Sequence, residues 1–219
     1  MNATAYTQKW KSDNNNQLVI DIETMANPDV IPLLPEPSID SRLKDPVKIA
    51  EAKAEAKAKQ IEKMALSPLT GKIAAVGLYG EFGGEVLIDD EKSMLDAVYA
   101  AIKVSQIITY NGKSFDIPFI FKRGIILGCE WATIPEMKLF TDRYKSGEAH
   151  IDLMVEFCNY GEYEKLDNLA RFILGSQKVE FDYREIPELL KTDEGKAKIT
   201  EYCLKDCELT YKLAKRMGF

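Results

Sequence analysis

The pattern of apolar and polar residues predicts several short strands separated by amphipathic helices. Residues 17–25, QLVIDIETM, form an apolar run that leads into two acidic residues, as expected of a strand. The segments 72–80 and 84–89 should form a hairpin beside this strand, joined by the turn EFGG. Shorter apolar runs predict two more strands, at 106–110 and 150–154.

Helical periodicity and capping residues predict five helices. The first is rich in Ala, Lys and Glu, with Asp45 as N-cap and Pro46 as the first helical residue. Its apolar side is narrow, so a solvated surface helix is the simpler interpretation. Gly175 is the expected C-cap of a later helix. The other predicted helices cover residues 91–103, 115–127, 165–174 and 192–218.

This order of elements predicts an α/β fold, in which helices pack on both faces of a mixed central sheet. We expect a flexible polar segment at residues 1–16 and a single domain at 17–219. Several prolines make the chain after the opening strand irregular until the first helix. The irregular segment and the first helix together form an insertion at about residues 27–66.

Composition restricts the classes of function. The 219 residues are 46% hydrophobic and carry a net charge of −6. The chain begins without the apolar run of a signal peptide, and no segment is long enough to span a bilayer, so we expect a cytoplasmic protein without membrane contact. The negative charge argues against a broad basic surface that coats nucleic acid. It does not exclude a nuclease, because bound divalent cations supply positive charge locally.

The cysteines and the single histidine give little basis for a zinc site. None of the four cysteines is part of a CxxC pair. Cys203 and Cys207 share a helix face at i, i+4, but without a further soft ligand nearby they are interpreted as buried thiols. His150 is expected to pack or cap beside its strand.

Acidic residues in the first strand suggest a metal site. Side chains alternate across a strand, so Asp21 and Glu23 lie on one face. Two adjacent negative charges repel each other unless both are solvated or a cation lies between them. A metal ion is the leading candidate for that cation.

Two later segments carry further candidates. Asp116 follows an Asn-Gly turn and enters a helix, where the helix N-terminus favours its charged form; an ordinary N-cap is the alternative. Tyr202 and Asp206 are spaced i, i+4 and therefore lie about 40° apart on one helix face. The alternative for this pair is a surface contact or a core tyrosine.

In this order and context, the five residues resemble the three motifs of the DEDD 3′-5′ exonuclease superfamily. The likeness is closest to the tyrosine branch, DEDDy, which includes the proofreading domains of family B DNA polymerases and polymerase-B-like predicted exonucleases. A histidine-type member would carry His at position 201, where this chain has Glu201, whereas Tyr202 fits the tyrosine type. The segments that carry the resemblance are DIET, SPLTGKIAAVGL, YNGKSFDIPFI, HIDLM, KLDNLARFILG and YCLKDCELTY.

The resemblance implies a ribonuclease H-like three-layer fold and two divalent cations, Mg²⁺ or Mn²⁺. Asp21 would bridge both ions, with Glu23 and Asp206 at one ion and Asp116 at the other. Tyr202 would hold the attacking water. The products would be 5′ mononucleotides released from a 3′ end.

The resemblance also points to contacts with the substrate. Thr24 and Met25 are expected against the terminal sugar and base, and Asn111 and Phe115 against the penultimate nucleotides. Ordinary turn and core positions are the alternative for these four residues. The insertion at about 27–66 would be either a solvated element or a lid that guides the strand.

Three functions remain open from the sequence. A DNA exonuclease acting on single strands in replication, proofreading or repair is preferred, alone or beside a polymerase or repair protein. An exoribonuclease that trims RNA is the first alternative, because discrimination at the 2′-hydroxyl depends on a few contacts. The second is an inactive nucleic-acid-binding or scaffold module, although all four carboxylates and the tyrosine are present.

Overall fold

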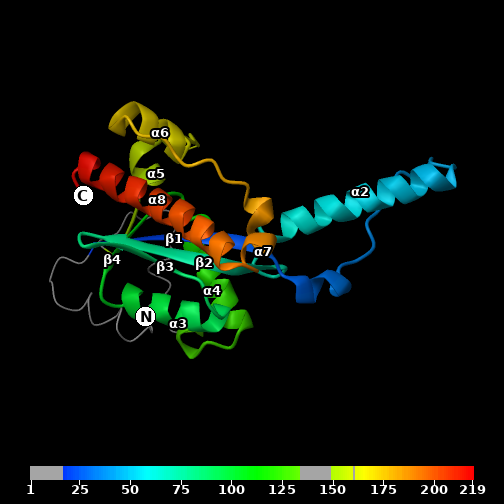
Figure 1. The fold of residues 1–219 in the computed structure, drawn as a ribbon, viewed down its shortest axis with the longest axis horizontal. Coiled ribbons are helices and arrows are strands. Elements are labelled where there is room, and N and C mark those ends of the chain that lie inside the picture. Colours follow the sequence, from blue (N-terminus) through cyan, green and yellow to red (C-terminus); the bar gives the residue numbers. More distant parts are fainter. Residues whose placement is uncertain (1–16, 134–148, 160) are drawn as a thin grey trace.

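A mixed five-stranded sheet forms the centre of the molecule (Figure 1). The computed structural model describes residues 17–133, 149–159 and 161–219; the polar segment expected at 1–16 lies outside these ranges. The strand order is β3-β2-β1-β4-β5. The strands are β1 (Gln17–Ala26), β2 (Gly71–Gly80), β3 (Gly83–Leu87), β4 (Gln106–Thr109) and β5 (His150–Asp152).

The helices predicted from periodicity are all found, and short helices that the pattern did not predict lie between them. No helix in the described ranges combines the length and the apolar character needed to cross a membrane. The helices are η1 (Pro28–Leu33), α2 (Pro46–Met64), α3 (Glu91–Ile102), α4 (Asp116–Ile126), η2 (Glu130–Thr133), α5 (Leu153–Phe157), α6 (Leu166–Leu174), η4 (Tyr183–Glu185), α7 (Ile186–Leu189) and α8 (Asp193–Met217).

Two predicted boundaries were wrong for local reasons. The strand predicted at 150–154 ends at Asp152, because the Asp152 side chain accepts a hydrogen bond from the Met154 N–H and caps α5. The chain predicted to be irregular after β1 contains the 3-10 helix η1, whose N-cap Asn27 accepts from the Asp29 N–H.

Strand β1 is central, but its two edges are paired over different lengths. It pairs antiparallel with β2 from Val19 to Ala26. Its pairing with β4 is parallel and, in the described sheet, covers only Gln17–Val19. The second half of β1 therefore extends beyond β4 and leaves one backbone edge open to other partners.

Helices cover both faces of the sheet, which confirms the predicted three-layer α/β fold. Leu18, Ile20 and Ile22 of β1 are buried in a cluster with residues of α3 and α4. Val19 faces the opposite side, in a cluster with Leu213 and other residues of α6 and α8. The alternation along β1 thus divides its side chains between two apolar layers.

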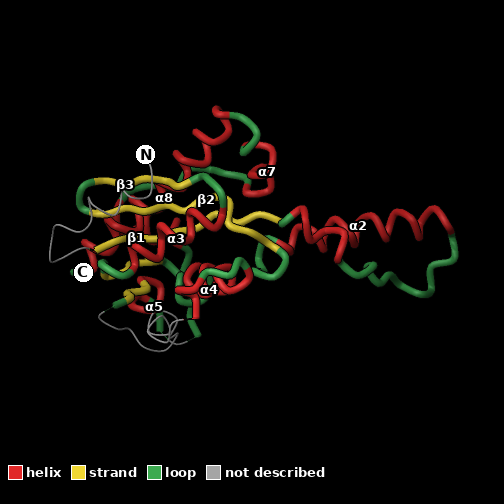
Figure 2. The backbone as a smooth tube through the Cα atoms, turned by 90° about the horizontal axis from the view of Figure 1, so that it is seen from below, coloured by secondary structure: helices red, strands yellow, loops and turns green. Residues whose placement is uncertain are grey.

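Helix α2 extends away from the sheet, as Figures 1 and 2 show. The Asp45 side chain caps it by accepting from the Val47 N–H at 2.9 Å, and Pro46 is its first residue, as predicted. All of α2 is described, and within it Met64 alone is buried. The prediction of a largely solvated helix is therefore confirmed.

Candidate active site

Strand β1 places Asp21 and Glu23 on the face covered by α8. They follow Val19, which packs with α8, whereas the intervening Ile22 packs with α3 and α4. The prediction that the two carboxylates share one face of the strand is confirmed by this alternation.

Asp116 is held against the open edge of β1. Its Oδ1 atom accepts a hydrogen bond of 3.0 Å from the Ile22 N–H, at the part of β1 that extends beyond its pairing with β4. The alternative of an ordinary N-cap was wrong, because Asp116 is the first residue within α4 and Phe115 is the N-cap position. This bond fixes the Asp116 carboxylate beside the segment that carries Asp21 and Glu23.

Helix α8 supplies Tyr202 and Asp206 from the layer above the sheet. Asp206 is only 4% exposed, and Tyr202 is half-buried. The Asp206 Oδ1 atom is buried and has no hydrogen-bond partner among the described residues. A buried carboxylate oxygen without a donor is costly, so this atom is a ready ligand for a cation.

Lys178 is a site residue that the sequence did not reveal. Its Nζ atom lies 2.5 Å from Asp206 Oδ2 and 3.5 Å from the Tyr202 hydroxyl oxygen. Phe181 stacks on the Tyr202 ring, with centroids 4.3 Å apart and planes 12° apart. Lys178 and Phe181 lie in an irregular segment between α6 and η4, where no periodicity or motif singled them out.

The pKa values show that the four carboxylates act on one another. Burial raises the pKa of Asp21 well above its ordinary value, and the charges of Asp116, Glu23 and Asp206 raise it further. Burial, followed by the Asp206 charge, raises the pKa of Glu23 to about 8. Burial raises the pKa of Asp116 to about 7 despite the hydrogen bond from Ile22. The structure thus brings the four predicted carboxylates into one electrostatic cluster.

A cation of the chain lies among these carboxylates. The Lys178 charge lowers the pKa values of Asp21, Glu23 and Asp206, against the larger effect of burial. Within the described residues, no three of the four carboxylates have ligand oxygens all within 4.8 Å of one another. The cluster is therefore more open than a closed metal site, with the ammonium group supplying part of the compensating charge.

The donor set fits divalent cations. Four carboxylates from β1, α4 and α8 offer only oxygen ligands, which hard cations such as Mg²⁺ and Mn²⁺ prefer. The unpartnered Asp206 Oδ1 and the mutual repulsion of the carboxylates both favour the arrival of positive charge.

Asp152 organises the turn that leads to Asp116. Its carboxylate accepts hydrogen bonds from the backbone N–H groups of Asn111 at 2.8 Å and Lys113 at 2.9 Å. Asn111 has a φ of 62°, in the left-handed region that Asn tolerates better than most residues. A polar residue at the end of a buried strand was the sequence signal for Asp152, but this role was not predicted.

The predicted substrate residues lie in two places. Thr24 and Met25 line a cavity of about 510 Å³, bordered by the C-terminal half of α2 and by residues of η4 and α7. Asn111 lies in the turn, and Phe115 packs on Phe119 with ring centroids 5.5 Å apart. These last two residues do not line that cavity, and the roles of all four toward a substrate stay predictions.

His150 packs beside its strand, as predicted. It is 1% exposed in β5, and its Nε2 atom lies 2.8 Å from Thr109 Oγ1 in the neighbouring strand. The hydrogen bond joins the two parallel strands beneath the turn rather than reaching the carboxylates.

Comparisons with known proteins place this site in context. Residues 71–218 match a family described as predicted 3′-5′ exonucleases related to the exonuclease domain of PolB. The matched range includes Asp116, Tyr202 and Asp206, whereas Asp21 and Glu23 precede it.

Curated relatives include two archaeal polymerases. The chain is 32% identical over 140 residues to DNA polymerase 1 of Sulfolobus acidocaldarius. This match covers 58% of this chain and 15% of that protein. It is 27% identical over 145 residues to the DNA polymerase of Thermococcus litoralis, covering 59% of this chain and 8% of that protein. The chain therefore spans a small part of the length of these relatives.

A solved structure shares the fold. The family B DNA polymerase from the hyperthermophilic archaeon Pyrobaculum calidifontis matches with a TM-score of 0.59 and 17% identity. The match covers 92% of this chain and 24% of that one. The predicted ribonuclease H-like fold is thereby confirmed.

Proposed function

The chain belongs to the family of predicted 3′-5′ exonucleases related to the exonuclease domain of PolB, and from that premise we propose that it removes 5′ mononucleotides from the 3′ end of single-stranded DNA. The observation that carries the proposal is the cluster of Asp21, Glu23, Asp116 and Asp206, in which the charges of the other three carboxylates lie close enough to raise the pKa of Asp21. A replication, proofreading or repair role is the matching biological context.

Divalent cations are part of the proposal. Asp21, Glu23, Asp116 and Asp206 would hold two Mg²⁺ or Mn²⁺ ions, for which their all-oxygen donor set is suited. When bound, the ions would activate water and stabilise the charge that develops on the phosphodiester. The buried Asp206 Oδ1 atom, without a donor in the described residues, supports this assignment.

Tyr202 would orient the attacking water as a neutral hydroxyl. Burial and the charge of Asp206 raise the pKa of Tyr202 above its ordinary value, so it keeps its proton at neutral pH. It can therefore donate and accept hydrogen bonds but cannot serve as the general base. Stacking on Phe181 fixes the ring plane, so the hydroxyl is held at the carboxylate cluster before substrate arrives.

Lys178 would stabilise negative charge at the site. Its ammonium group contacts Asp206 and lies 3.5 Å from the Tyr202 hydroxyl. Burial lowers the pKa of Lys178, but the neighbouring carboxylates, Asp206 above all, together raise it above its ordinary value, so the ammonium stays charged throughout the neutral range. A scissile phosphate placed at the cluster would meet a fixed positive charge, which is the arrangement that stabilises a charged transition state.

The terminal nucleotide would lie at the end of β1. Thr24 and Met25 follow the first two carboxylates and line the cavity of about 510 Å³, which is a suitable size for a small ligand group. The C-terminal half of α2 borders the same cavity, so the insertion at 27–66 would act as a lid over the strand end. Asn111 and Phe115 would contact the nucleotides that precede it.

Matched oligonucleotides test the proposal directly. DNA and RNA of one sequence, each labelled at the 5′ end, are incubated with Mg²⁺ or Mn²⁺, and a second set has a blocked 3′ end. The proposal expects a ladder of shortened DNA that the 3′ block prevents. Faster shortening of RNA would support the exoribonuclease alternative, and binding without cleavage would support the inactive module.

A further inference from the structure

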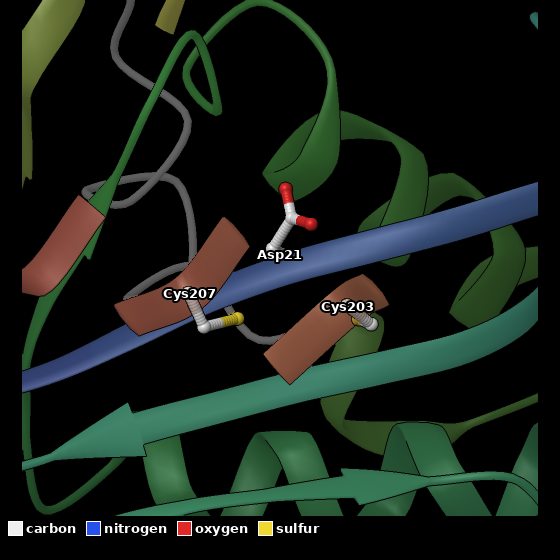
Figure 3. Close-up of side chains that lie close together, drawn as sticks. All are labelled: Asp21, Cys203 and Cys207. Carbon is white, nitrogen blue, oxygen red and sulfur yellow. The ribbon is translucent and has the colours of Figure 1, made fainter. Parts of the chain in front are cut away.

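Two thiols lie directly behind the carboxylate cluster. Cys203 and Cys207 are fully buried on the face of α8 that meets the sheet, beside Asp21 of β1 (Figure 3). One ligand atom from each of these three residues lies within 4.8 Å of the other two. Among the described residues this is the one group of metal-ligating side chains with that spacing.

A glycine in the sheet makes room for this group. Gly77 of β2 pairs with Asp21 in the strand register. A Cβ atom at Gly77 would lie 2.5 Å from Cys207 Sγ and 2.8 Å from Cys203 Sγ, which is too close for any side chain. The two sulfurs therefore pack against bare backbone, and this close approach brings them beside the Asp21 carboxylate.

From the sequence these cysteines are interpreted as buried thiols because no further soft ligand is near them. The structure adds a third ligand of a different kind, the hard carboxylate oxygen of Asp21. Cys207 packs in the apolar cluster with Val19 and Leu213, as a core thiol does. A carboxylate oxygen of Asp21, which is half-buried and belongs to the neighbouring site, nevertheless lies within 4.8 Å of both sulfurs.

Two sulfurs and one carboxylate oxygen favour a particular class of cation. Zinc takes thiolate sulfur at about 2.3 Å and carboxylate oxygen at about 2.0 Å in tetrahedral sites. These lengths separate the ligand atoms of one ion by roughly 3.5 to 3.8 Å. The atoms of this group lie within 4.8 Å of one another, so they can reach that spacing only by moving closer where they exceed it. Magnesium and manganese prefer oxygen ligands alone, so they would not use the two sulfurs.

We propose that Asp21, Cys203 and Cys207 form a second metal site, which binds a thiophilic divalent cation such as Zn²⁺ or Cd²⁺. Three protein ligands leave a fourth position for water or for a neighbouring carboxylate. Because Asp21 belongs to both sites, the thiophilic ion withdraws it from the carboxylate cluster. If the proposed exonuclease function holds, this cation is therefore an inhibitor that acts through Asp21.

Cadmium titration tests the site without reference to catalysis. Metal-free full-length protein is titrated with Cd²⁺ while the ultraviolet charge-transfer band of cadmium thiolate is recorded. We expect a band that saturates at one ion per chain, is lost in Cys203→Ala/Cys207→Ala and is kept in the control Cys158→Ser. No band, or an equal band in the double variant, would overturn the proposal.

A second set of measurements covers the case in which the double variant does not fold. Cys207→Ser alone keeps the volume of the side chain and should remove about half of the band, whereas full intensity would contradict the proposal. X-ray absorption of the zinc-loaded protein should show both sulfur and oxygen ligands; oxygen and nitrogen ligands alone would overturn it.

Inhibition is measured separately from binding. With wild-type protein that cleaves DNA in Mg²⁺, added Zn²⁺ should inhibit cleavage at concentrations at least tenfold lower than those that inhibit Cys207→Ser. Equal sensitivity of the two proteins to Zn²⁺ would contradict inhibition through the proposed thiol site. An inactive wild-type protein that still gives the cadmium band would reject the exonuclease function while leaving the thiol site intact.

Discussion

The Lys178 ammonium lies 2.5 Å from the Asp206 carboxylate, so the chain itself places a cation within its carboxylate cluster. The lysine is largely buried there, with 27% of its side chain exposed. Its charge offsets part of the repulsion among the carboxylates when divalent ions are absent. The same charge opposes the binding of further cations, so it should influence both metal affinity and catalysis.

Replacement of Lys178 should separate these two effects. In Lys178→Met we expect Mn²⁺ affinity, measured by calorimetry, to rise by on the order of tenfold because a neighbouring positive charge is removed. Cleavage at saturating metal should fall, because the phosphate loses a fixed positive charge. Lys198→Met, at an exposed position of α8, is the control and should change neither. Unchanged Mn²⁺ affinity in Lys178→Met would contradict the placement of the ammonium.

Tyr202→Phe should affect turnover rather than metal binding. The phenyl ring can still stack on Phe181, but it lacks the hydroxyl that would orient water. We expect kcat to fall on the order of 100-fold, with Mn²⁺ affinity close to that of the wild type. Tyr211→Phe on the same helix is the matched control. A Tyr202→Phe enzyme with full kcat would exclude the hydroxyl from the reaction.

Asp152→Asn should loosen the turn that carries Asp116. The amide is a weaker acceptor than the carboxylate that now receives the N–H groups of Asn111 and Lys113. We expect the free energy of unfolding, from denaturant titration, to fall by about 1 to 3 kcal/mol. In the fraction that remains folded, kcat should also fall because Asp116 is less well positioned. Wild-type stability and kcat in Asp152→Asn would show that neither the turn nor the position of Asp116 depends on the Asp152 carboxylate.

Stability of the metal-free protein should decrease as pH rises. The pKa of Glu23 is about 8 against an ordinary 4.5, and that of Asp116 is about 7 against 3.8. The folded state thus holds these protons more tightly than the unfolded state. The contribution to stability is complete below about pH 4 and is lost as pH rises toward 8.

Thermal melts in chelator at a series of pH values test whether stability falls as pH rises. The melting temperature should fall between pH 5 and pH 8, and Glu23→Gln should flatten the fall, whereas Glu201→Gln on exposed α8 surface should not. Saturating Mg²⁺ should restore stability at pH 8, because the ions replace the protons. A melting temperature that rises over this range in chelator would contradict the buried carboxylate cluster.

Local signals in the sequence predicted most of the fold. The alternation in β1 and the caps at Asp45 and Gly175 each depend on neighbouring residues alone, so they could be read directly. The short helix α5 escaped prediction because a single side chain, Asp152, ends the strand and starts the helix.

The candidate site could be predicted only where residues occur in a recognisable order. Asp21, Glu23, Asp116, Tyr202 and Asp206 follow the spacing and contexts of a known set of motifs. Lys178 and the proximity of Asp21 to Cys207 depend on how α8 and an irregular segment pack on the sheet. Such long-range packing leaves no periodic trace in the chain, so only the structure revealed these contacts.

Degradation of 5′-labelled single-stranded DNA in Mg²⁺ or Mn²⁺ tests the central claim most directly. The wild type and Glu201→Gln are compared with Asp21→Asn and Asp206→Asn, each first shown to be folded by its melting temperature. The account predicts a ladder shortened from the 3′ end in the first two proteins and intact substrate in the last two. Equal cleavage by all four, or no metal-dependent cleavage by the wild type, would contradict it.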